Sequence, residues 1–138
     1  MKVDHNQSSS LELDILGDKW TLLILRDMLF EEKSSFSEFK ASSEKIASNI
    51  LTDRLAKLDA AGFVIKTSSI GNKVKYRYSL TDKAIDLLPV FVALFSWAEK
   101  HGTECSNPII KRLITNDSDA LKAYSRELKK HRDATLGI

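Results

Sequence analysis

Apolar and polar positions follow two periods along this chain, one typical of helices and one typical of strands. The stretch 19–30, KWTLLILRDMLF, carries apolar residues on nearly every side of a helix, and Asp18 before it can cap the first turn. A helix that is apolar all round is normally buried between layers. This stretch is therefore predicted to be the central core helix.

Two further helical patterns follow, separated by a polar turn. The first, over 36–41, places two phenylalanines three apart on one face, and a pair of serines then gives a turn signal. The second, over 46–61, ends at Gly62, as helices commonly end at glycine. Its predicted inner stripe consists of Ala47, Leu51, Leu55 and Leu58.

The side of helix 46–61 opposite this stripe is small and polar near its N-terminus, where Ser48, Asn49, Thr52 and Asp53 lie on or beside it. Groove-inserted helices commonly meet base edges with such residues, because Asn can pair bidentately with adenine and Thr can contact thymine. Simple capping and solvation is the alternative interpretation. Arg54 flanks the buried face, where it either contacts phosphate or pairs with an acid such as Asp53 or Glu44.

From Phe63 the period changes to two. Phe63 and Ile65 predict a first strand, Gly71-Asn72 predicts a turn, and residues 73–80 return. One face of the return should pack on the core: Val74, Tyr76, Tyr78 and Leu80. The other face presents a row of cations that suits DNA phosphates, or that protects the strand edge against aggregation: Lys73, Lys75 and Arg77.

The second half of the chain predicts more helices. Thr81 can cap a helix that runs to His101, with a kink or restart at Pro89. Its apolar residues occupy more faces than one small domain can cover, so a second subunit is the natural cover. Shorter patterns predict helices at 109–115 and 119–131, the last capped by Asp117 or Ser118.

Charge is unevenly distributed. Residues 40–83 hold nine basic and four acidic side chains, a local charge of +5 that leaves −3 for the rest of a chain whose total is +2. Positive charge therefore gathers on the helix–turn–helix and hairpin, as phosphate binding requires. The longest apolar run is nine residues, too short for a membrane span, and the N-terminus lacks a secretory signal, so a cytoplasmic protein is expected.

Catalytic and metal chemistry have little support. One cysteine excludes an intramolecular disulfide, and His101 with Cys105 would be a weak pair of metal ligands. No nucleophile–base pair, phosphate-cradling glycine loop or carboxylate dyad has supporting context. We expect no enzyme, no metal and no cofactor.

The order of these elements resembles the HxlR-type branch of the MarR-like winged-helix regulators, over roughly Leu13 to Lys100. The matching blocks are LDILGDKWTLLILRDMLF, FSEF, NILTDRLAKLDAAGFV, YRYSLTDKA and LLPVFVALFSWAEKH. The resemblance implies a mainly α, dimeric winged helix-turn-helix with a small β-hairpin wing and helical N- and C-terminal dimerisation segments. The chain is expected to be a single domain over 1–138, with a family core at 10–101 and a helical extension at 102–138.

The resemblance also implies a homodimer that binds a pseudo-palindromic operator in double-stranded DNA. Helix 46–61 would read the major groove and the wing, 64–80, would contact the backbone. The expected DNA contacts are Lys40, Ser48, Asn49, Thr52, Asp53, Arg54, Lys57, Lys73, Lys75 and Arg77. The expected dimer contacts are Leu11, Leu88, Phe91, Val92, Phe95 and Trp97.

Family members often carry a Cys-Pro pair before the first helix. The corresponding positions here are Gln7-Ser8, so thiol sensing by that route is not expected. An unidentified small-molecule effector stays an open class of partner. The alternative function is a winged-helix module that binds protein without specific DNA binding.

Overall fold

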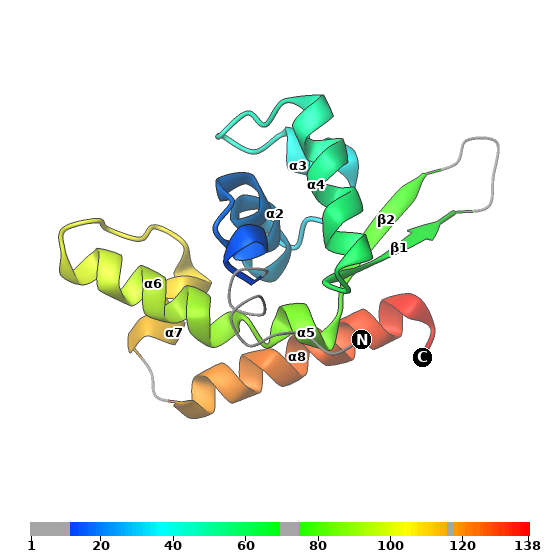
Figure 1. The fold of residues 1–138 in the computed structure, drawn as a ribbon. Coiled ribbons are helices and arrows are strands. Elements are labelled where there is room, and N and C mark those ends of the chain that lie inside the picture. Colours follow the sequence, from blue (N-terminus) through cyan, green and yellow to red (C-terminus); the bar gives the residue numbers. More distant parts are fainter. Residues whose placement is uncertain (1–11, 70–74, 116–117) are drawn as a thin grey trace, which may run out of the picture.

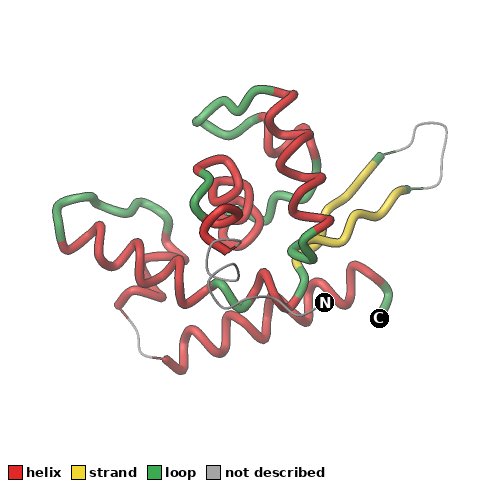
Figure 2. Tube along the Cα trace, viewed as in Figure 1, coloured by secondary structure: helices red, strands yellow, loops and turns green. Residues whose placement is uncertain are grey.

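The structure is a computed structural model that describes residues 12–69, 75–115 and 118–138. Helices surround a central helix, and a two-stranded antiparallel hairpin projects from one side (Figures 1 and 2). Residues 12–16 form a helical segment before the first labelled helix. The labelled elements are α2 (Lys19–Phe30), α3 (Phe36–Lys40), α4 (Ser48–Ala60), β1 (Val64–Ser68), β2 (Tyr76–Leu80), α5 (Asp82–Ile85), α6 (Leu88–Lys100), α7 (Pro108–Thr115) and α8 (Ser118–Leu136).

Helix α2 is the centre of the domain and contacts both α4 and β2. The Asp18 carboxylate accepts a hydrogen bond from the backbone N–H of Thr21 at 2.9 Å, so the predicted N-cap is confirmed. Leu25 and Leu29 are completely buried. The prediction of a central core helix is therefore confirmed.

Helices α3 and α4 form the helix-turn-helix with α2 beneath them. Phe39 is buried, but Phe36, the first residue of the five-residue α3, is 38% exposed, so only one of the two phenylalanines enters the core. Helix α4 begins at Ser48 rather than at 46, and Ala47 is its exposed N-cap. Ile46 is buried in place of the predicted Ala47. Ala47 has extended backbone and so does not follow the helical spacing of the inner stripe.

The hairpin pairs Val64 with Leu80 at its base and Ser68 with Tyr76 toward its tip. On the first strand Val64 shares a face with Leu80 and is 2% exposed, whereas Ile65 lies on the other face and is 36% exposed. Tyr78 and Leu80 are buried as predicted, but Tyr76 is 49% exposed, because the hairpin extends past the helices there. The predicted turn at Gly71-Asn72, with Val74, lies outside the described residues.

The long apolar stretch after the wing restarts at a proline, as predicted. Thr81 accepts a hydrogen bond from Ala84 N–H and caps α5, and Pro89 stands in the first turn of α6. An aromatic cluster then holds α6 and α8 on α2. The ring centroid of Phe30 lies 6.1 Å from that of Phe91 and 6.2 Å from that of Tyr124.

Helices α7 and α8 close the opposite side of the domain from α4 (Figure 1). The Asn107 side chain accepts hydrogen bonds from two backbone N–H groups of the first turn of α7. Helix α8 continues to Leu136, past the predicted end at 131, and Arg132 explains part of this extension. Its guanidinium pairs with Asp82 at 2.7 Å and donates to the Leu80 carbonyl at 3.0 Å. Among the described residues no helix is long and apolar enough to cross a membrane.

Candidate nucleic-acid interface

Helix α4 has one buried face and one exposed face that is polar near the N-terminus. Its inner side chains, Leu51, Leu55 and Leu58, are at most 2% exposed. Its outer side chains near the N-terminus are all exposed: Ser48, Asn49, Thr52 and Asp53. The Thr52 hydroxyl donates to the Ser48 carbonyl at 2.9 Å, which leaves its lone pairs and methyl group turned to solvent.

Arg54 fixes α4 against the start of α2. Its Nε and Nη2 donate to the two carboxylate oxygens of Asp18 at 2.8 and 3.1 Å, and Nη1 donates to Asp53 at 2.7 Å. The hydrogen bond from Arg54 is the largest influence that holds the pKa of Asp18 well below its ordinary value. Of the two roles considered for Arg54, pairing with acids is thus observed, with Asp18 and Asp53 as partners rather than Glu44.

A second ionic cluster fixes the turn between α3 and α4. Arg26 donates to both carboxylate oxygens of Glu44 at 3.0 Å, and this lowers the pKa of Glu44 to about 2. Asp27 is 3% exposed, accepts a hydrogen bond from the Ser42 hydroxyl and lies 3.5 Å from Lys33 Nζ. A buried carboxylate must be satisfied in this way to be tolerated.

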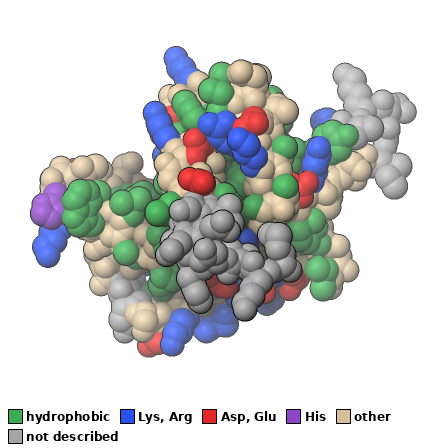
Figure 3. All heavy atoms as spheres, in the orientation of Figure 1, with side chains coloured by type: hydrophobic (Ala, Val, Ile, Leu, Met, Phe, Trp, Pro, Cys, Tyr) green, Lys and Arg blue, Asp and Glu red, His purple; other side chains and the backbone are tan. Residues whose placement is uncertain are grey.

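Two predicted DNA contacts in this region already have partners within the chain. Lys40 Nζ donates to the Ile46 carbonyl at 2.7 Å and so closes the turn that leads into α4. Lys57 Nζ lies 3.1 Å from the Asp53 carboxylate, but its side chain is 69% exposed and open to a further contact. Figure 3 shows basic and acidic side chains intermixed over α3 and α4.

The wing presents Lys75 and Arg77, which are both exposed. Lys73 lies outside the described residues. Arg77 Nη1 donates to the Ser34 hydroxyl at 3.1 Å, and the Tyr78 N–H donates to the Ser34 carbonyl at 2.8 Å. The wing is therefore tied to the α2–α3 turn, so it has a defined position relative to the helix-turn-helix.

The predicted dimer contacts on α6 divide into two groups. Leu88 and Phe91 are 1% and 3% exposed within the chain's own core, so the prediction that they contact a second subunit is corrected. Val92 and Phe95 are half-buried and also pack on this core. Trp97 is 62% exposed, and Leu11 lies outside the described residues.

The large exposed apolar side chains of α6 instead form one stripe, Val90, Leu94 and Trp97, which are 57%, 48% and 62% exposed. Their spacing of four and three places them on one face of the helix. We call these three residues the α6 stripe; hydrophobic side chains are visible at the surface over α6 in Figure 3. The sequence showed that this helix has more apolar faces than one small domain can cover. The packing of α6 on the aromatic cluster around Phe30 determines which of these faces stays exposed.

The pairing of Arg26 with Glu44 and of Asp27 with Ser42 was not predicted from the sequence, where Glu44 was considered only as a partner of Arg54. Their separations along the chain, 15 residues from Asp27 to Ser42 and 18 from Arg26 to Glu44, carry no periodic signal. Cys105 is half-buried and free, and no group of three or more potential metal ligands occurs in the described part of the chain.

Comparison with known proteins agrees with this geometry. Residues 15–106 match the model of the HxlR-like helix-turn-helix family. The uncharacterized HTH-type transcriptional regulator YvaP of Bacillus subtilis is 33% identical over 86 residues, which are 62% of this chain and 79% of the relative. The regulator BH0655 of Halalkalibacterium halodurans is 33% identical over 89 residues, 64% of this chain and 79% of that protein.

Solved structures give the same result. PA1607, named a candidate transcription factor, is 36% identical, with a TM-score of 0.59. The match covers 68% of this chain and 64% of that chain, so this chain spans slightly less than two-thirds of PA1607. The redox regulator HypR in its reduced form is 26% identical with a TM-score of 0.59 over 67% of this chain and 91% of that chain. The winged-helix architecture, the matched residues and these relatives place the chain in the HxlR-like helix-turn-helix family of transcriptional regulators.

Proposed function

We propose that this protein is a sequence-specific DNA-binding regulator that acts as a homodimer on a pseudo-palindromic operator. Helix α4 would enter the major groove and the β1–β2 wing would contact the adjacent backbone. The observation that carries the proposal is the contrast between the two faces of α4. Leucines hold one face in the core, while Asn49 and Thr52 project from the other into solvent.

The ionic contacts around α4 support this role. A recognition helix has to be held rigidly, because base contacts depend on sub-ångström placement. Arg54 bridges α4 to the cap of α2, and Arg26 holds Glu44 in the preceding turn. We propose that Arg54 mainly positions α4, while Asn49 and Thr52 contact bases, Ser48 and Asp53 flank them, and Lys57, Lys75 and Arg77 contact phosphates.

The α6 stripe supports the homodimer. Val90, Leu94 and Trp97 expose large apolar side chains side by side, and such a face is normally covered by another apolar surface. In a two-fold dimer the same face would meet its own copy, and the two α4 helices would then face successive half-sites. Because its partner is DNA, we also propose that the protein acts in the cytoplasm, by binding and without a catalytic step.

Selection of bound fragments from random DNA tests the function. We expect a palindromic motif with half-sites about one helical turn apart. If each subunit contacts about three phosphates, the logarithm of the DNA association constant should fall with the logarithm of the salt concentration, with a slope of about −5. Recovery of no enriched motif, with little salt-dependent binding, would reject the proposal and favour a protein-binding module.

A further inference from the structure

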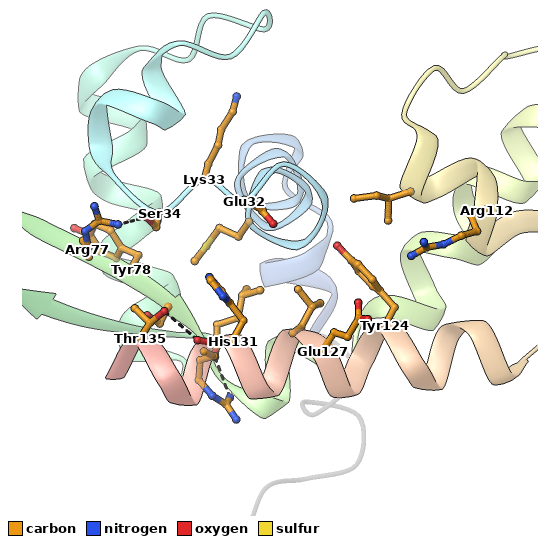
Figure 4. A pocket seen from close by; sticks show the side chains of 16 residues that line it. Glu32, Lys33, Ser34, Arg77, Tyr78, Arg112, Tyr124, Glu127, His131 and Thr135 are labelled. Carbon is orange, nitrogen blue, oxygen red and sulfur yellow. Dashed lines mark hydrogen bonds between the residues drawn. The ribbon is translucent and has the colours of Figure 1, made fainter. Parts of the chain in front are cut away.

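A cavity of about 530 Å³ lies between the wing and the C-terminal helix (Figure 4). Four segments line it: the end of α2 with the α2–α3 turn, then β2, α7 and α8. Its volume falls within the range typical of small-molecule sites. Helices α7 and α8 begin at Pro108 and Ser118, beyond the stretch 15–106 that matches the family model, so the cavity depends on this chain's own extension.

The floor of the cavity is largely apolar and buried. Met28, Tyr78, Leu80 and Tyr124 line it while being at least nine-tenths buried. The Tyr124 hydroxyl donates to the Leu29 carbonyl at 2.5 Å, and its ring stacks on that of Phe30 with an interplanar angle of 2°. Burial raises the pKa of Tyr124 to about 12, so this wall stays neutral at physiological pH.

The basic side chains that line the cavity differ in how far they are already paired with acceptors in the chain. Lys33 already contacts Asp27 and Ser42, and Arg132 already contacts Asp82 and Asp133. Arg77, by contrast, donates one of its five N–H groups to the Ser34 hydroxyl. Within the described residues it has no carboxylate at salt-bridge distance.

The acidic groups lie toward the other end of the cavity. Glu32 and Glu127 both act electrostatically on Tyr124, which Figure 4 places away from Arg77 and toward Arg112. Charges of both signs, Arg112 with Glu32 and Glu127, thus act at the Tyr124 end, whereas Arg77 lies at the wing end of the cavity.

We propose that this cavity binds a compact organic anion, with its apolar body on the Tyr78–Tyr124 floor and its acidic head on Arg77. The proposal rests on the proposed function in one respect: Arg77 is also a candidate phosphate contact of the wing. One guanidinium cannot serve both anions fully, so ligand and DNA binding oppose each other. This coupling is reciprocal, because each ligand changes the affinity of the other by the same factor.

The test uses the full chain and two isosteric probes, 2-naphthoate and the neutral 2-naphthamide, with binding followed by probe fluorescence. We expect 2-naphthoate to bind at least about tenfold more tightly than 2-naphthamide, as a charge-assisted hydrogen bond implies. Arg77→Gln should remove this preference. Lys75→Ala, a wing cation that does not line the cavity, should leave it unchanged.

Adding a selected operator should weaken 2-naphthoate binding at least about fivefold, in the usual range of coupling between sites. Equal binding of the two probes, unchanged binding in Arg77→Gln, or no binding of 2-naphthoate would overturn the site. Unaltered affinity in the presence of operator would overturn the coupling. If no DNA sequence binds while the Arg77-dependent preference for 2-naphthoate holds, the proposed function fails and the cavity site stands.

Discussion

Helices α4 and α6 have the same length, 13 residues, and each buries one face in the same core, but their outer faces differ completely. The outer face of α4 carries Ser48, Asn49 and Thr52, whereas that of α6 carries the α6 stripe. Burial alone therefore does not distinguish the two helices. The chemistry of the face left outside does, because a polar face can hydrogen-bond base edges and an apolar face is stabilised only by another apolar surface.

The largest effect should follow from breaking the buried face of α4. Leu51 is completely buried, so Leu51→Ala should lower the free energy of unfolding by about 2–5 kcal/mol through lost burial and the cavity left behind. Urea denaturation measures this change. The adjacent Thr52→Ala is the matched control and should stay within about 0.5 kcal/mol of wild type. Equal effects of the two substitutions would contradict the assignment of the faces.

The exposed apolar face of α6 can be altered by a substitution that leaves the core unchanged. Trp97→Asp should raise the dimer dissociation constant at least about thirtyfold, as expected for a central aromatic contact. Analytical ultracentrifugation over a concentration series measures it, and Ser96→Asp, exposed off the stripe, is the control. A wild-type protein that stays monomeric, or a Trp97→Asp variant that dimerises normally, would remove α6 from the interface.

The link between α2 and α4 should depend on pH. Asp18→Asn keeps the cap but loses the ion pair with Arg54, so it should cost about 1–2 kcal/mol at neutral pH. The pKa of Asp18 is lowered in the folded protein, so its stabilisation is complete above the ordinary value of 3.8 and is lost as the pH falls below that value.

Unfolding of wild type and Asp18→Asn between pH 7 and pH 2 measures this convergence. The curves should approach each other below about pH 4. Asp59→Asn, a carboxylate exposed on the same α4, serves as the control and should have little effect at any pH. A constant difference down to pH 2 would show that the ion pair is not the cause.

The smallest effect is expected at the wing. Lys75→Ala should weaken binding to all DNA sequences by a similar factor and reduce the salt slope by about 2 per dimer, since each subunit loses one phosphate contact. Lys122→Ala on α8, an exposed cation on the other side of the domain from α4, should change neither quantity. A sequence-dependent loss in Lys75→Ala would indicate base contact instead.

Periodicity was sufficient to predict the helices, the wing and the inner leucines of α4, because each of these follows from the spacing of apolar residues along one element. It failed at element ends. Ala47 and Tyr76 were predicted to face the core but are exposed. Ala47 is the extended N-cap and so lies outside the helical spacing, and Tyr76 lies where the hairpin extends past the helices.

The contacts between elements could not be predicted in the same way. Arg54 reaches Asp18 across 36 residues, and Arg132 reaches Leu80 across 52. Which apolar face of α6 stays exposed depends on where the Phe30 ring and α8 pack, and no local pattern contains that information. The cavity beside Arg77 is likewise a product of four segments distant in sequence.

The claim that the polar face of α4 reads sequence is tested most directly by the affinities of wild type and Asn49→Ala. Each is measured for a selected operator and for random DNA at one salt concentration. Because Asn49 is exposed on the polar face of α4, its loss should cost about 1–3 kcal/mol on the operator and leave random-DNA affinity and the free energy of unfolding unchanged. If Asn49→Ala bound both DNAs as wild type does, or lost both equally, α4 would not be the element that reads sequence.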